Sequence, residues 1–366
     1  MKISLPAEVC KKAHKVLKLP LRGVTKALPV LSYVKVEVDE NGVLFTSTNL
    51  EMSVVYDPGL SYTGGEYGVM LIPLALLDVI GDGVVTFTDD KGELIRDYLG
   101  KYRDTRIDPS EFPVWSAQVD KLVSWFSAEQ MKDLTSLIPF CSKDESRPNL
   151  FAVRLLGKDG FIRFDATDGW KLAMIESAPA FEYEGEQLVP LPVLQKLKGL
   201  LTTVKPNTIG WGIQTVEKNP MHRAEPYGSF WMEYGFGNIE LRYIGIDGNF
   251  PNADAIRYPG TEYAEIETDK LRLYVDAAVK SKQEHVPLMF HDGKMSFGDA
   301  EQPFPNRLEF TIHFNPVYLQ ACLSLFNGHC QFHSIASNLP ATFKTDGREV
   351  ILMPMRAPDY TGIVVS

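Results

Sequence analysis

The sequence repeats one motif, and this repetition constrains the fold more than any other feature. The clearest copy spans residues 147–174, an earlier copy spans residues 29–50, and a weaker third copy spans residues 285–297. The first two copies keep the same interval between proline and threonine, since Pro29 and Thr48 correspond to Pro148 and Thr167. A repeated unit indicates that function belongs to the assembled architecture more than to a single catalytic loop.

Each repeat is predicted to contain two helices set among alternating strands. Ser127 and Gln130 suit a capped helix start, and Thr268 is expected to be an N-cap. Proline at the start and glycine after the end support the second helix of each repeat. The expected helices are residues 6–18, 127–137 and 268–280, each followed in its repeat by 73–80, 192–198 and 315–326, respectively. The aromatic-rich stretch 211–236 is expected to be a long hairpin, and residues 329–333 a strand.

The predicted fold class is therefore α+β, with three repeated domains of two helices packed on antiparallel sheets. Phe-Pro follows polar turn residues at two junctions, Asp108–Pro113 and Asp247–Pro251, as expected of extended linkers. The predicted domains are residues 1–118, 119–250 and 251–366, and the last includes an extension at 357–366.

Composition limits the class of protein. The chain has 366 residues, four cysteines without C-x-x-C spacing, and a net charge of -10. The cysteines predict buried or free thiols in a reducing cytoplasm. No signal peptide and no apolar run of membrane-spanning length are recognised, so no membrane partner is expected. The charge argues against a wholly basic nucleic-acid binder, but not against one that concentrates positive charge on one surface.

Positive charge recurs on the predicted helices. A run of basic residues is most often only a solvated helix face, and that interpretation stays open for each helix taken alone. Basic helices that recur in an acidic protein favour a surface that neutralises phosphates without reading bases. The helical candidates for DNA contact are Lys11, Lys12, Lys15, Lys196, Lys198, Lys270 and Arg272.

The repeated motifs resemble those of the bacterial DNA polymerase III β subunit, the sliding-clamp family, over nearly the whole chain. The resemblance rests on Ala166–Ala173, Leu28–Leu31, Asp247–Pro251 and the near-terminal Val350–Arg356. It implies a head-to-tail homodimeric ring around duplex DNA, with helices inside and sheets outside. It also implies a processivity factor rather than an enzyme, without catalytic residues, metal or cofactor. The implied partners are a replicative polymerase, a clamp loader and other proteins with a clamp-binding motif.

The resemblance implies a pocket between the second and third domains for a short hydrophobic peptide. An apolar groove of leucine, isoleucine and methionine suits a Leu or Phe anchor. Its wall would comprise Leu150, Thr167, Gly169, Trp170, Lys171, Leu172, Pro251, Ile256, Asn315, Tyr318, Leu339, Ala341, Ile351, Leu352, Met353, Pro354, Met355 and Arg356. Without the family match, each apolar residue of this set would be read as plain core.

The chain departs from the family pattern at several positions. Trp170-Lys171 replaces the usual His-Arg, which makes the pocket rim bulkier, and Ala255 replaces a frequent arginine. The extension 357–366 starts at the pocket, and the hypothesis is that it either folds over the pocket and partly occludes it or alters the set of partners. By position, loop contacts with DNA transfer to Arg22, Lys26, Lys143 and Arg147. The subunit interface transfers to Tyr102, Asp104, Ile107, Lys280 and Ser281, a polar set that suggests a weaker closure.

Two other classes remain open at this stage. A metal-dependent nuclease would use Asp165, Asp168 and Asp247 with His291 or His333, although aspartates at strand ends are commonly backbone caps. A tandem-repeat scaffold without a role on DNA would share the repeats and the pocket. Retention on circular but not on linear DNA separates a clamp from a scaffold.

Overall fold

The computed structural model describes residues 1–21, 28–62, 66–90, 92–115, 119, 121–179, 183–214, 226–258, 264–304 and 308–356. Arg22, Lys26 and the extension 357–366 lie outside the described residues. The chain divides into two compact units, and each is described by itself. Unit 1 comprises Met1–Thr135, Ala178–Tyr183 and Val189–Asp247, and unit 2 comprises Ser136–Ser177, Glu184–Leu188 and Gly248–Ser366.

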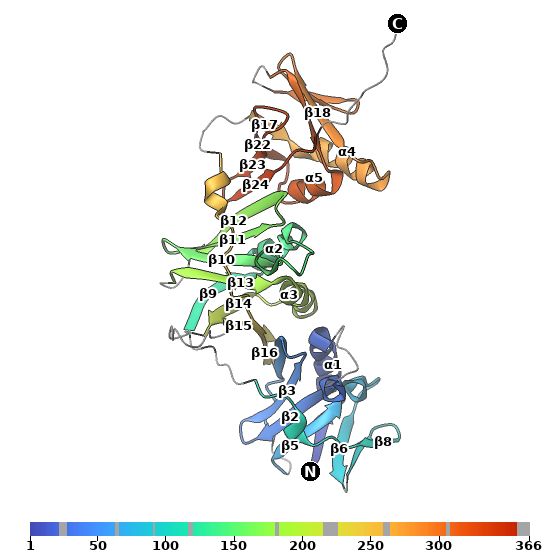
Figure 1. Ribbon diagram of the computed structural model, residues 1–366. Coiled ribbons are helices and arrows are strands. Elements are labelled where there is room, and N and C mark those ends of the chain that lie inside the picture. The colour runs from blue at the N-terminus through green and yellow to red at the C-terminus, as the bar shows by residue number, and fades with distance from the viewer. Residues whose placement is uncertain are drawn as a thin grey trace. The chain divides into compact units, whose positions relative to one another are not determined.

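The order of elements repeats three times along the chain (Figure 1). Each repeat has a strand, a helix, four strands, a second helical segment and three strands. The first repeat comprises β1 (Lys2–Pro6), α1 (Ala7–Leu21), β2 (Tyr33–Asp39), β3 (Gly42–Thr48), β4 (Met52–Asp57), β5 (Gly68–Pro73), the 3₁₀ turn η2 (Leu74–Leu77), β6 (Val84–Asp90), β7 (Glu93–Asp97) and β8 (Lys101–Thr105). The three domain boundaries expected from the sequence remain a prediction.

The second and third repeats follow the same order. The second comprises β9 (Lys121–Ser127), α2 (Ala128–Ser136), β10 (Ala152–Lys158), β11 (Phe161–Thr167), β12 (Lys171–Pro179), β13 (Gly185–Pro190), α3 (Leu191–Val204), β14 (Thr208–Ile213), β15 (Tyr227–Tyr234) and β16 (Gly237–Ile244). The third comprises β17 (Ala264–Glu267), α4 (Thr268–Lys280), β18 (Val286–His291), β19 (Lys294–Phe297), β20 (Ala300–Pro303), β21 (Phe310–Phe314), α5 (Pro316–Leu323), β22 (His329–His333), β23 (Ala341–Thr345) and β24 (Arg348–Leu352). Short 3₁₀ turns are η1 (Pro29–Ser32), η3 (Pro109–Glu111), η4 (Ile138–Phe140), η5 (Pro148–Leu150) and η6 (Ala253–Ile256).

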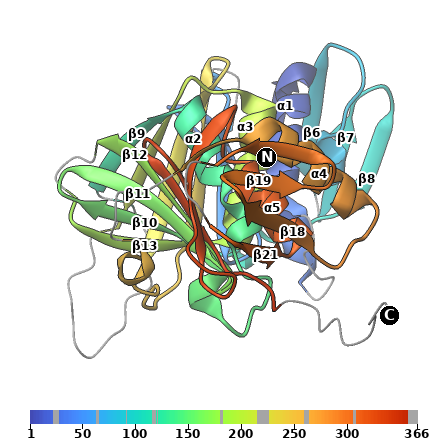
Figure 2. The ribbon, with the colours of Figure 1, turned by 90° about the horizontal axis from the view of Figure 1, so that it is seen from above.

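Each repeat contributes two sets of four antiparallel strands. In unit 1, the order β5-β2-β3-β4 continues as β16-β15-β14-β9, because β4 pairs with β16. In unit 2, β13-β10-β11-β12 continues as β24-β23-β22-β17, because β12 pairs with β24. Figure 2 shows β10, β11 and β12 side by side. The sets β1-β6-β7-β8 and β20-β19-β18-β21 form sheets of four strands.

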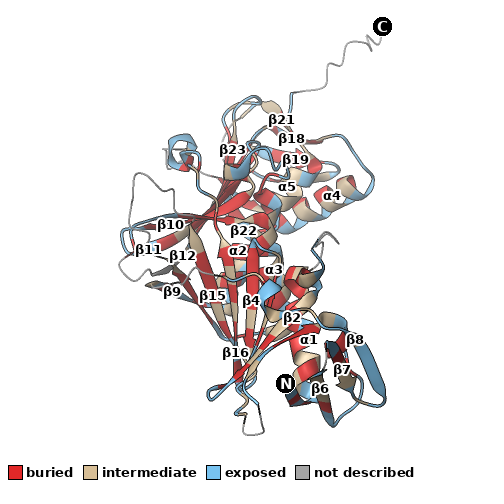
Figure 3. Cartoon of the chain, turned by 60° about the horizontal axis from the view of Figure 1, so that its bottom comes forward, coloured by how far each residue is buried: buried red, intermediate tan, exposed pale blue. Residues whose placement is uncertain are grey.

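Helix α1 covers the eight-stranded sheet of unit 1. Its buried residues include Ala7, Cys10, Ala13 and Val16, a spacing that places them on one helix face. This face packs on β3 and β4. Figure 3 shows buried residues along the strands and on the packed sides of the helices. The fold therefore leaves the lysines of α1 on its less buried side.

In unit 2, helices α4 and α5 lie side by side (Figure 1). An aromatic cluster joins the eight-stranded sheet of unit 2 to the sheet β20-β19-β18-β21. The Phe332 ring stacks on Phe290 with centroids 5.7 Å apart and meets Phe343 edge-on at 5.0 Å. Because Phe290 belongs to β18 while Phe332 and Phe343 belong to β22 and β23, this cluster fixes one sheet against the other.

Some sequence predictions are confirmed and others are wrong. The start of α2 is confirmed as a capping box, because Ser127 N–H donates to Gln130 Oε1 and Gln130 N–H donates to Ser127 Oγ. Residues 329–333 form the predicted strand, β22. The helix predicted at 73–80 is wrong: only the 3₁₀ turn η2 forms, and Asp78 already has extended backbone angles.

The predicted cap at Thr268 is also wrong. Thr268 is the first residue of α4, and Glu267 occupies the cap position. The Thr268 hydroxyl instead donates to the Gly328 carbonyl at 3.0 Å. A partner distant in sequence has therefore replaced the expected local one. Among the described residues, no helix is long and apolar enough to cross a membrane.

Candidate peptide-binding site and basic surface

Three segments of unit 2 form a cavity of about 420 Å³. They are residues 139–147, the turn between β11 and β12, and the first turns of α5. The lining residues are Pro139, Cys141, Ser142, Lys143, Asp144, Arg147, Asp168, Trp170, Lys171, Val317, Tyr318 and Ala321. Apolar and charged side chains therefore share one concave surface.

Lys171 is the charged centre of this cavity. Its side chain is only 5% exposed, and its ammonium forms an ion pair with the Asp168 carboxylate. The same ammonium lies 4.2 Å from the centroid of the Tyr318 ring and 5.9 Å from that of Phe140. A desolvated ammonium over an aromatic face gains cation–π attraction, so Lys171 ties β12 to α5.

The turn that positions Lys171 is closed by its own side chains. Asp168 Oδ1 accepts hydrogen bonds from the N–H groups of Trp170 and Lys171, at 2.9 and 3.0 Å. Gly169 has φ +93°, and an added Cβ would lie 3.3 Å from Arg147 Nη2. Glycine at this position therefore admits both the left-handed backbone and the nearby arginine.

The start of α5 forms another side of the cavity, and residues 353–355 are hydrogen-bonded near it without lining it. Asn315 caps α5, because its side-chain oxygen accepts hydrogen bonds from Val317 and Tyr318 N–H. Met353 N–H donates to the Trp170 carbonyl at 2.9 Å, and Met355 N–H donates to the His313 carbonyl at 2.7 Å. Backbone hydrogen bonds therefore hold the segment after β24 against both β12 and β21.

Burial also tunes the titratable groups of the wall. It raises the pKa of Cys141 to about 12, so this thiol stays neutral at physiological pH. Burial, assisted by the Asp168 carboxylate, raises the pKa of Tyr318. Burial lowers the pKa of His313, and the nearby His285 lowers it further. None of these shifts prepares a nucleophile.

The predicted pocket residues divide by exposure. The Trp170 and Val317 side chains are 58% and 56% exposed. Val317 was not among the residues predicted from the sequence. Exposed members of the predicted set are Gly169, Trp170, Pro251, Ile256, Leu339, Met353, Met355 and Arg356. Buried members are Leu150, Thr167, Lys171, Leu172, Ala341, Ile351 and Leu352, and half-buried members are Asn315, Tyr318 and Pro354. The large exposed apolar side chains are available to a ligand, whereas the buried members support them.

Only part of the predicted set lines the cavity, namely Trp170, Lys171 and Tyr318. Lys143 and Arg147, which the sequence suggested for DNA contact, line it as well. Cys141, Asp144 and Ala321 were missed, because their contribution depends on the approach of segments distant in sequence. The Asn315-Pro316 helix start was a usable signal for Val317, which follows it directly.

The aspartates considered for a nuclease are engaged otherwise. Asp165 is fully buried and accepts hydrogen bonds from Arg154 and Arg163. Asp168 caps the turn described above. His333 stacks on Tyr258 with ring centroids 3.4 Å apart. The described residues contain no group of three or more His, Cys, Asp or Glu that could hold a metal ion.

Several of the predicted DNA-contacting cations already have acidic partners. Lys12 pairs with Glu8 at 2.8 Å, and Lys270 pairs with Glu267 at 3.1 Å. Lys11 lies 3.6 Å from Asp82. Arg272 donates to the Leu323 carbonyl at 3.0 Å and to that of Phe326 at the end of α5. Its main contact is therefore structural, a role that the charge pattern did not indicate.

A groove of unit 1 concentrates positive charge instead. It has a volume of about 500 Å³ and lies between α2 and the C-terminal end of α3. Its lysines are Lys132, Lys198 and Lys205, and no acidic residue of the described part of the chain lines it. Lys205 has φ +53° as the residue that ends α3. The sequence argument named Lys198 but missed Lys132 and Lys205, which only the packing of the helices brings to one groove.

The fold is similar to that of several solved bacterial proteins. The DNA polymerase III β subunit from Thermotoga maritima matches with a TM-score of 0.79 at 17% identity, covering 98% of this chain and 100% of that one. The subunit from Pseudomonas aeruginosa gives 0.80 at 20% identity with the same coverage. A putative β subunit from Eubacterium rectale gives 0.82 at 14% identity, again with 98% and 100% coverage. The chain therefore has the clamp fold of these subunits.

Sequence comparison points to the same group. The beta sliding clamp of Chlamydia pneumoniae is 25% identical over 180 residues, which are 46% of this chain and 48% of that protein. The beta sliding clamp of Chlamydia muridarum is 24% identical over 186 residues, with the same shares. The matched segment thus spans about half the length of these relatives. No family model matches the sequence. The chain is therefore similar to β sliding clamps in its fold and, over about half of its length, in its sequence.

Proposed function

We propose that two copies of this chain form a ring that encloses duplex DNA and slides along it as a processivity factor for a DNA polymerase. The observation that carries this proposal is the repeated strand pairing. Within the chain, β4 pairs with β16 and β12 pairs with β24. The corresponding strands of the remaining repeats are β20 and β8, which end their sheets in the described part of the chain.

The same pairing between two copies would unite β20 of one chain with β8 of the other. A strand edge presents unpaired N–H and C=O groups, and its antiparallel union with a second edge satisfies both. A chain with one edge of each kind closes with a second copy by a head-to-tail contact, which forms a ring when the rotation closes. This assembly would contain six repeats.

The residues expected at the subunit interface fit this arrangement. Tyr102 and Asp104 lie on β8, and Ile107 follows it. Lys280 is the last residue of α4, and Ser281 follows with its hydroxyl bonded to the Ala277 carbonyl. The edges themselves are polar, because β8 carries Lys101, Arg103 and Asp104 while β20 carries Glu301. Arg103 pairs with Glu93 and Glu301 pairs with Lys294 within the chain, so the backbone groups of the two edges carry this proposal.

Contact with DNA is assigned to basic helix surfaces. The groove of Lys132, Lys198 and Lys205 has cations without lining carboxylates, which suits phosphate oxygens. Contacts with phosphates carry no sequence information, so such a surface holds DNA of any sequence. Enclosure by the ring, rather than tight base contacts, would retain the DNA and still allow sliding.

Partner proteins are assigned to the cavity around Lys171 and to the exposed apolar side chains beside it. Trp170, Val317, Met353 and Met355 offer surface for a Leu or Phe anchor, and methionines adapt to different partners. Such a peptide contact would tether a polymerase, a clamp loader or a repair protein to the ring. Tethering raises the local concentration of the partner at the DNA.

In this proposal the protein performs no chemistry, and it acts where the replicating DNA lies, in the cytoplasm. The three predicted domains, 1–118, 119–250 and 251–366, correspond to the three repeats of element order. They are proposed as the folding units of the ring. Each half of the ring would thus consist of three similar domains.

Topological retention on DNA tests the function directly. Asp104→Cys on β8 and Glu301→Cys on β20 allow the two copies to be joined by a short bis-maleimide. The natural cysteines Cys10, Cys141, Cys322 and Cys330 are all buried and do not compete. After cross-linking in the presence of circular duplex, the protein is expected to stay on the DNA in high salt and to leave after the circle is cut.

Two outcomes would reject this function. Equal loss from circular and cut DNA would show that the DNA is not enclosed, and binding of the hydrophobic peptide would then favour a scaffold. Failure of the two cysteines to cross-link, while each single variant is fully reactive, would reject the β8–β20 contact. The single Asp104→Cys variant is the matched control, since it cannot close a ring at both contacts.

A further inference from the structure

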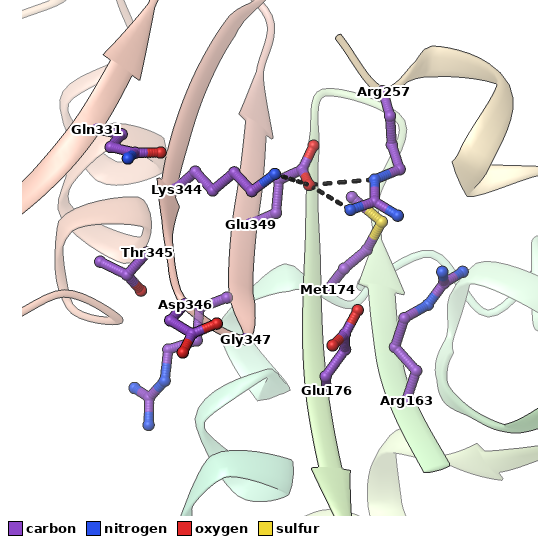
Figure 4. A pocket seen from close by; sticks show the side chains of 11 residues that line it. Arg163, Met174, Glu176, Arg257, Gln331, Lys344, Thr345, Asp346, Gly347 and Glu349 are labelled. Carbon is purple, nitrogen blue, oxygen red and sulfur yellow. Dashed lines mark hydrogen bonds and ion pairs between the residues drawn. The ribbon is translucent and has the colours of Figure 1, made fainter. Parts of the chain in front are cut away.

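A second cavity in unit 2 has a lining that the clamp function does not use. It has a volume of about 410 Å³ and lies over β11, β12, β23 and β24, where β12 pairs with β24 (Figure 4). Met174 and Glu349 are opposite each other in that pairing, and both line the cavity. None of its lining residues belongs to the predicted peptide pocket or lines the cavity around Lys171.

Four cationic side chains line this cavity, and each contacts an acceptor within the chain. Arg348 Nη1 donates to the Leu325 carbonyl at 3.0 Å, and the Lys344 ammonium lies 4.0 Å from Glu349 Oε2. Arg163 Nη1 donates to Asp254 at 2.8 Å, and its Nε donates to Asp165 at 2.9 Å. Arg257 donates to Glu349 Oε2 through Nε and Nη2, at 3.1 and 2.7 Å. These pairs leave few arginine N–H groups for an anionic ligand.

The carboxylate of Glu349, in contrast, keeps an oxygen without a hydrogen-bond partner among the described residues. Glu349 is only 4% exposed, and this oxygen is its Oε1. In Figure 4 both dashed contacts of Glu349, from Lys344 and Arg257, end on the same carboxylate oxygen. A buried polar atom without a partner costs about 1–3 kcal/mol and calls for an explanation.

Two further carboxylates line the same cavity. Among the described residues, no hydrogen bond or ion pair is made by the side chain of Glu176 or of Asp346. Figure 4 shows the Glu176 side chain between those of Glu349 and Arg163. The cavity therefore combines engaged donors with three carboxylates that retain free acceptor capacity.

We propose that this cavity binds an organic cation through a guanidinium group. Such a group brings several N–H donors for Glu176, Asp346 and the wall at Glu349. A bare metal ion fits less well, because the described residues hold no group of three metal-ligating side chains. The volume lies in the range of about 300–1,000 Å³ typical of small-ligand clefts.

The cationic group has two possible sources with the same chemistry. It belongs either to a free small molecule or to an arginine side chain of a bound protein. A free ligand would bind through its guanidinium and also through its α-ammonium group. A protein side chain would bind through the guanidinium alone. The test separates these sources by ligand design.

Calorimetric titration of the full-length protein with L-argininamide tests the proposal. L-citrullinamide has nearly the same shape and the same α-amino group, but an uncharged urea replaces its guanidinium, so it is the matched ligand control. Argininamide is expected to bind at least about tenfold more tightly than citrullinamide, since charge carries the recognition. Equal affinity of the two ligands, or no binding of argininamide up to millimolar concentration, overturns the proposal.

Two variants locate the site. Glu176→Gln and Asp346→Asn remove exposed charges without touching the core, and each is expected to weaken argininamide binding about three- to tenfold. Asp292→Asn, an exposed change in the same unit outside the cavity, is the control and is expected to leave affinity unchanged. Unchanged affinity in both cavity variants overturns the assignment.

The peptide acetyl-Gly-Arg-Gly-amide then identifies the source. It presents the guanidinium without a free ammonium. Affinity equal to that of argininamide supports the proposal with a protein side chain as ligand. A loss of tenfold or more supports the proposal with a free small molecule as ligand. Both results depend on the cavity variants weakening binding, and neither depends on the clamp function.

Discussion

The ammonium of Lys171 lies 4.2 Å from the centre of the Tyr318 ring. Lys171 begins β12, and Tyr318 lies in the first turns of α5, so this contact joins the second and third repeats at the candidate peptide site. Trp170 precedes Lys171 and Val317 precedes Tyr318, so the contact lies next to the two most exposed large apolar side chains that line the cavity. Ion pairing with Asp168 holds the ammonium in place.

Removal of the Lys171 charge is expected to lower stability. Lys171→Met would leave Asp168 without its ammonium and would end the contact with Tyr318. Because the pair is largely buried, the free energy of unfolding should fall by about 3–5 kcal/mol. Urea denaturation measures this change. Lys294→Met, which breaks the exposed pair with Glu301, is the matched control and should have little effect. Similar effects of the two variants would contradict the buried role of Lys171.

A charge placed on the apolar wall should weaken peptide binding. Val317→Asp puts a carboxylate beside Trp170, where an apolar anchor would have to desolvate it. The affinity for a labelled peptide with a Leu-Phe anchor is expected to fall at least tenfold, or about 1.4 kcal/mol. Fluorescence anisotropy measures the affinity. Ile335→Asp changes an equally exposed side chain that does not line the cavity, and its affinity should match that of the natural protein.

The lysine groove should determine the salt dependence of DNA binding. The triple variant Lys132→Gln, Lys198→Gln, Lys205→Gln removes up to three phosphate contacts. The slope of log affinity against log salt should become shallower by roughly 0.9 for each phosphate that the protein no longer neutralises. Electrophoretic or anisotropy titrations at several salt concentrations give the slope.

A charge-matched triple variant controls that experiment. Lys2→Gln, Lys158→Gln, Lys294→Gln changes the net charge equally at exposed positions outside the groove. Its slope is expected to remain near that of the natural protein. An equal change in both triple variants would mean that only net charge matters, which contradicts a phosphate site in the groove.

The buried thiol of Cys10 should make stability fall in alkaline solution. Burial raises its pKa from 9.0 to about 12. Between these values the unfolded chain loses the proton while the folded chain keeps it, so the stabilisation is complete below pH 9 and is lost as the pH rises toward 12. In Cys10→Ala the fall of unfolding free energy over this window should be shallower by up to about 1.4 kcal/mol per pH unit.

Denaturation at pH 8 to 11 measures this slope. Leu17→Val, a core change on the same helix without a titrating group, should lower stability and leave the slope unchanged. A Cys10→Ala slope equal to that of the natural protein would contradict the raised thiol pKa.

Local features of the fold could be predicted from sequence. The capping box at Ser127 and Gln130 is readable, because both partners lie within one helical turn. The order of strands and helices followed from repeated spacing for the same reason. The first repeat lacks a full second helix, because the chain extends at Asp78 after a single 3₁₀ turn. A run of apolar residues with proline at its start and glycine at or near its end occurs both at this 3₁₀ turn and at the full second helices. The pattern therefore does not distinguish a turn from a helix.

Contacts across long sequence separations could not be predicted. Arg272 looked like a free helical cation, yet it caps the end of α5, some fifty residues away. Thr268 bonds Gly328 over a similar separation. The cavity around Lys171 and the groove at Lys205 likewise depend on packing, which sequence periodicity does not encode. The family resemblance named part of the first site, and only tertiary structure indicated Val317, Lys132 and Lys205.

The contact between the edges β8 and β20 of two copies should be visible in solution. Light scattering after size exclusion, across protein concentrations, measures it. The protein is expected to have a molar mass of twice 41.0 kDa, and its dimer dissociation constant should rise roughly tenfold in Tyr102→Glu on β8 but not in Tyr67→Glu, an exposed change outside that strand. A mass of 41.0 kDa at every concentration, or equal effects of the two variants, would contradict it.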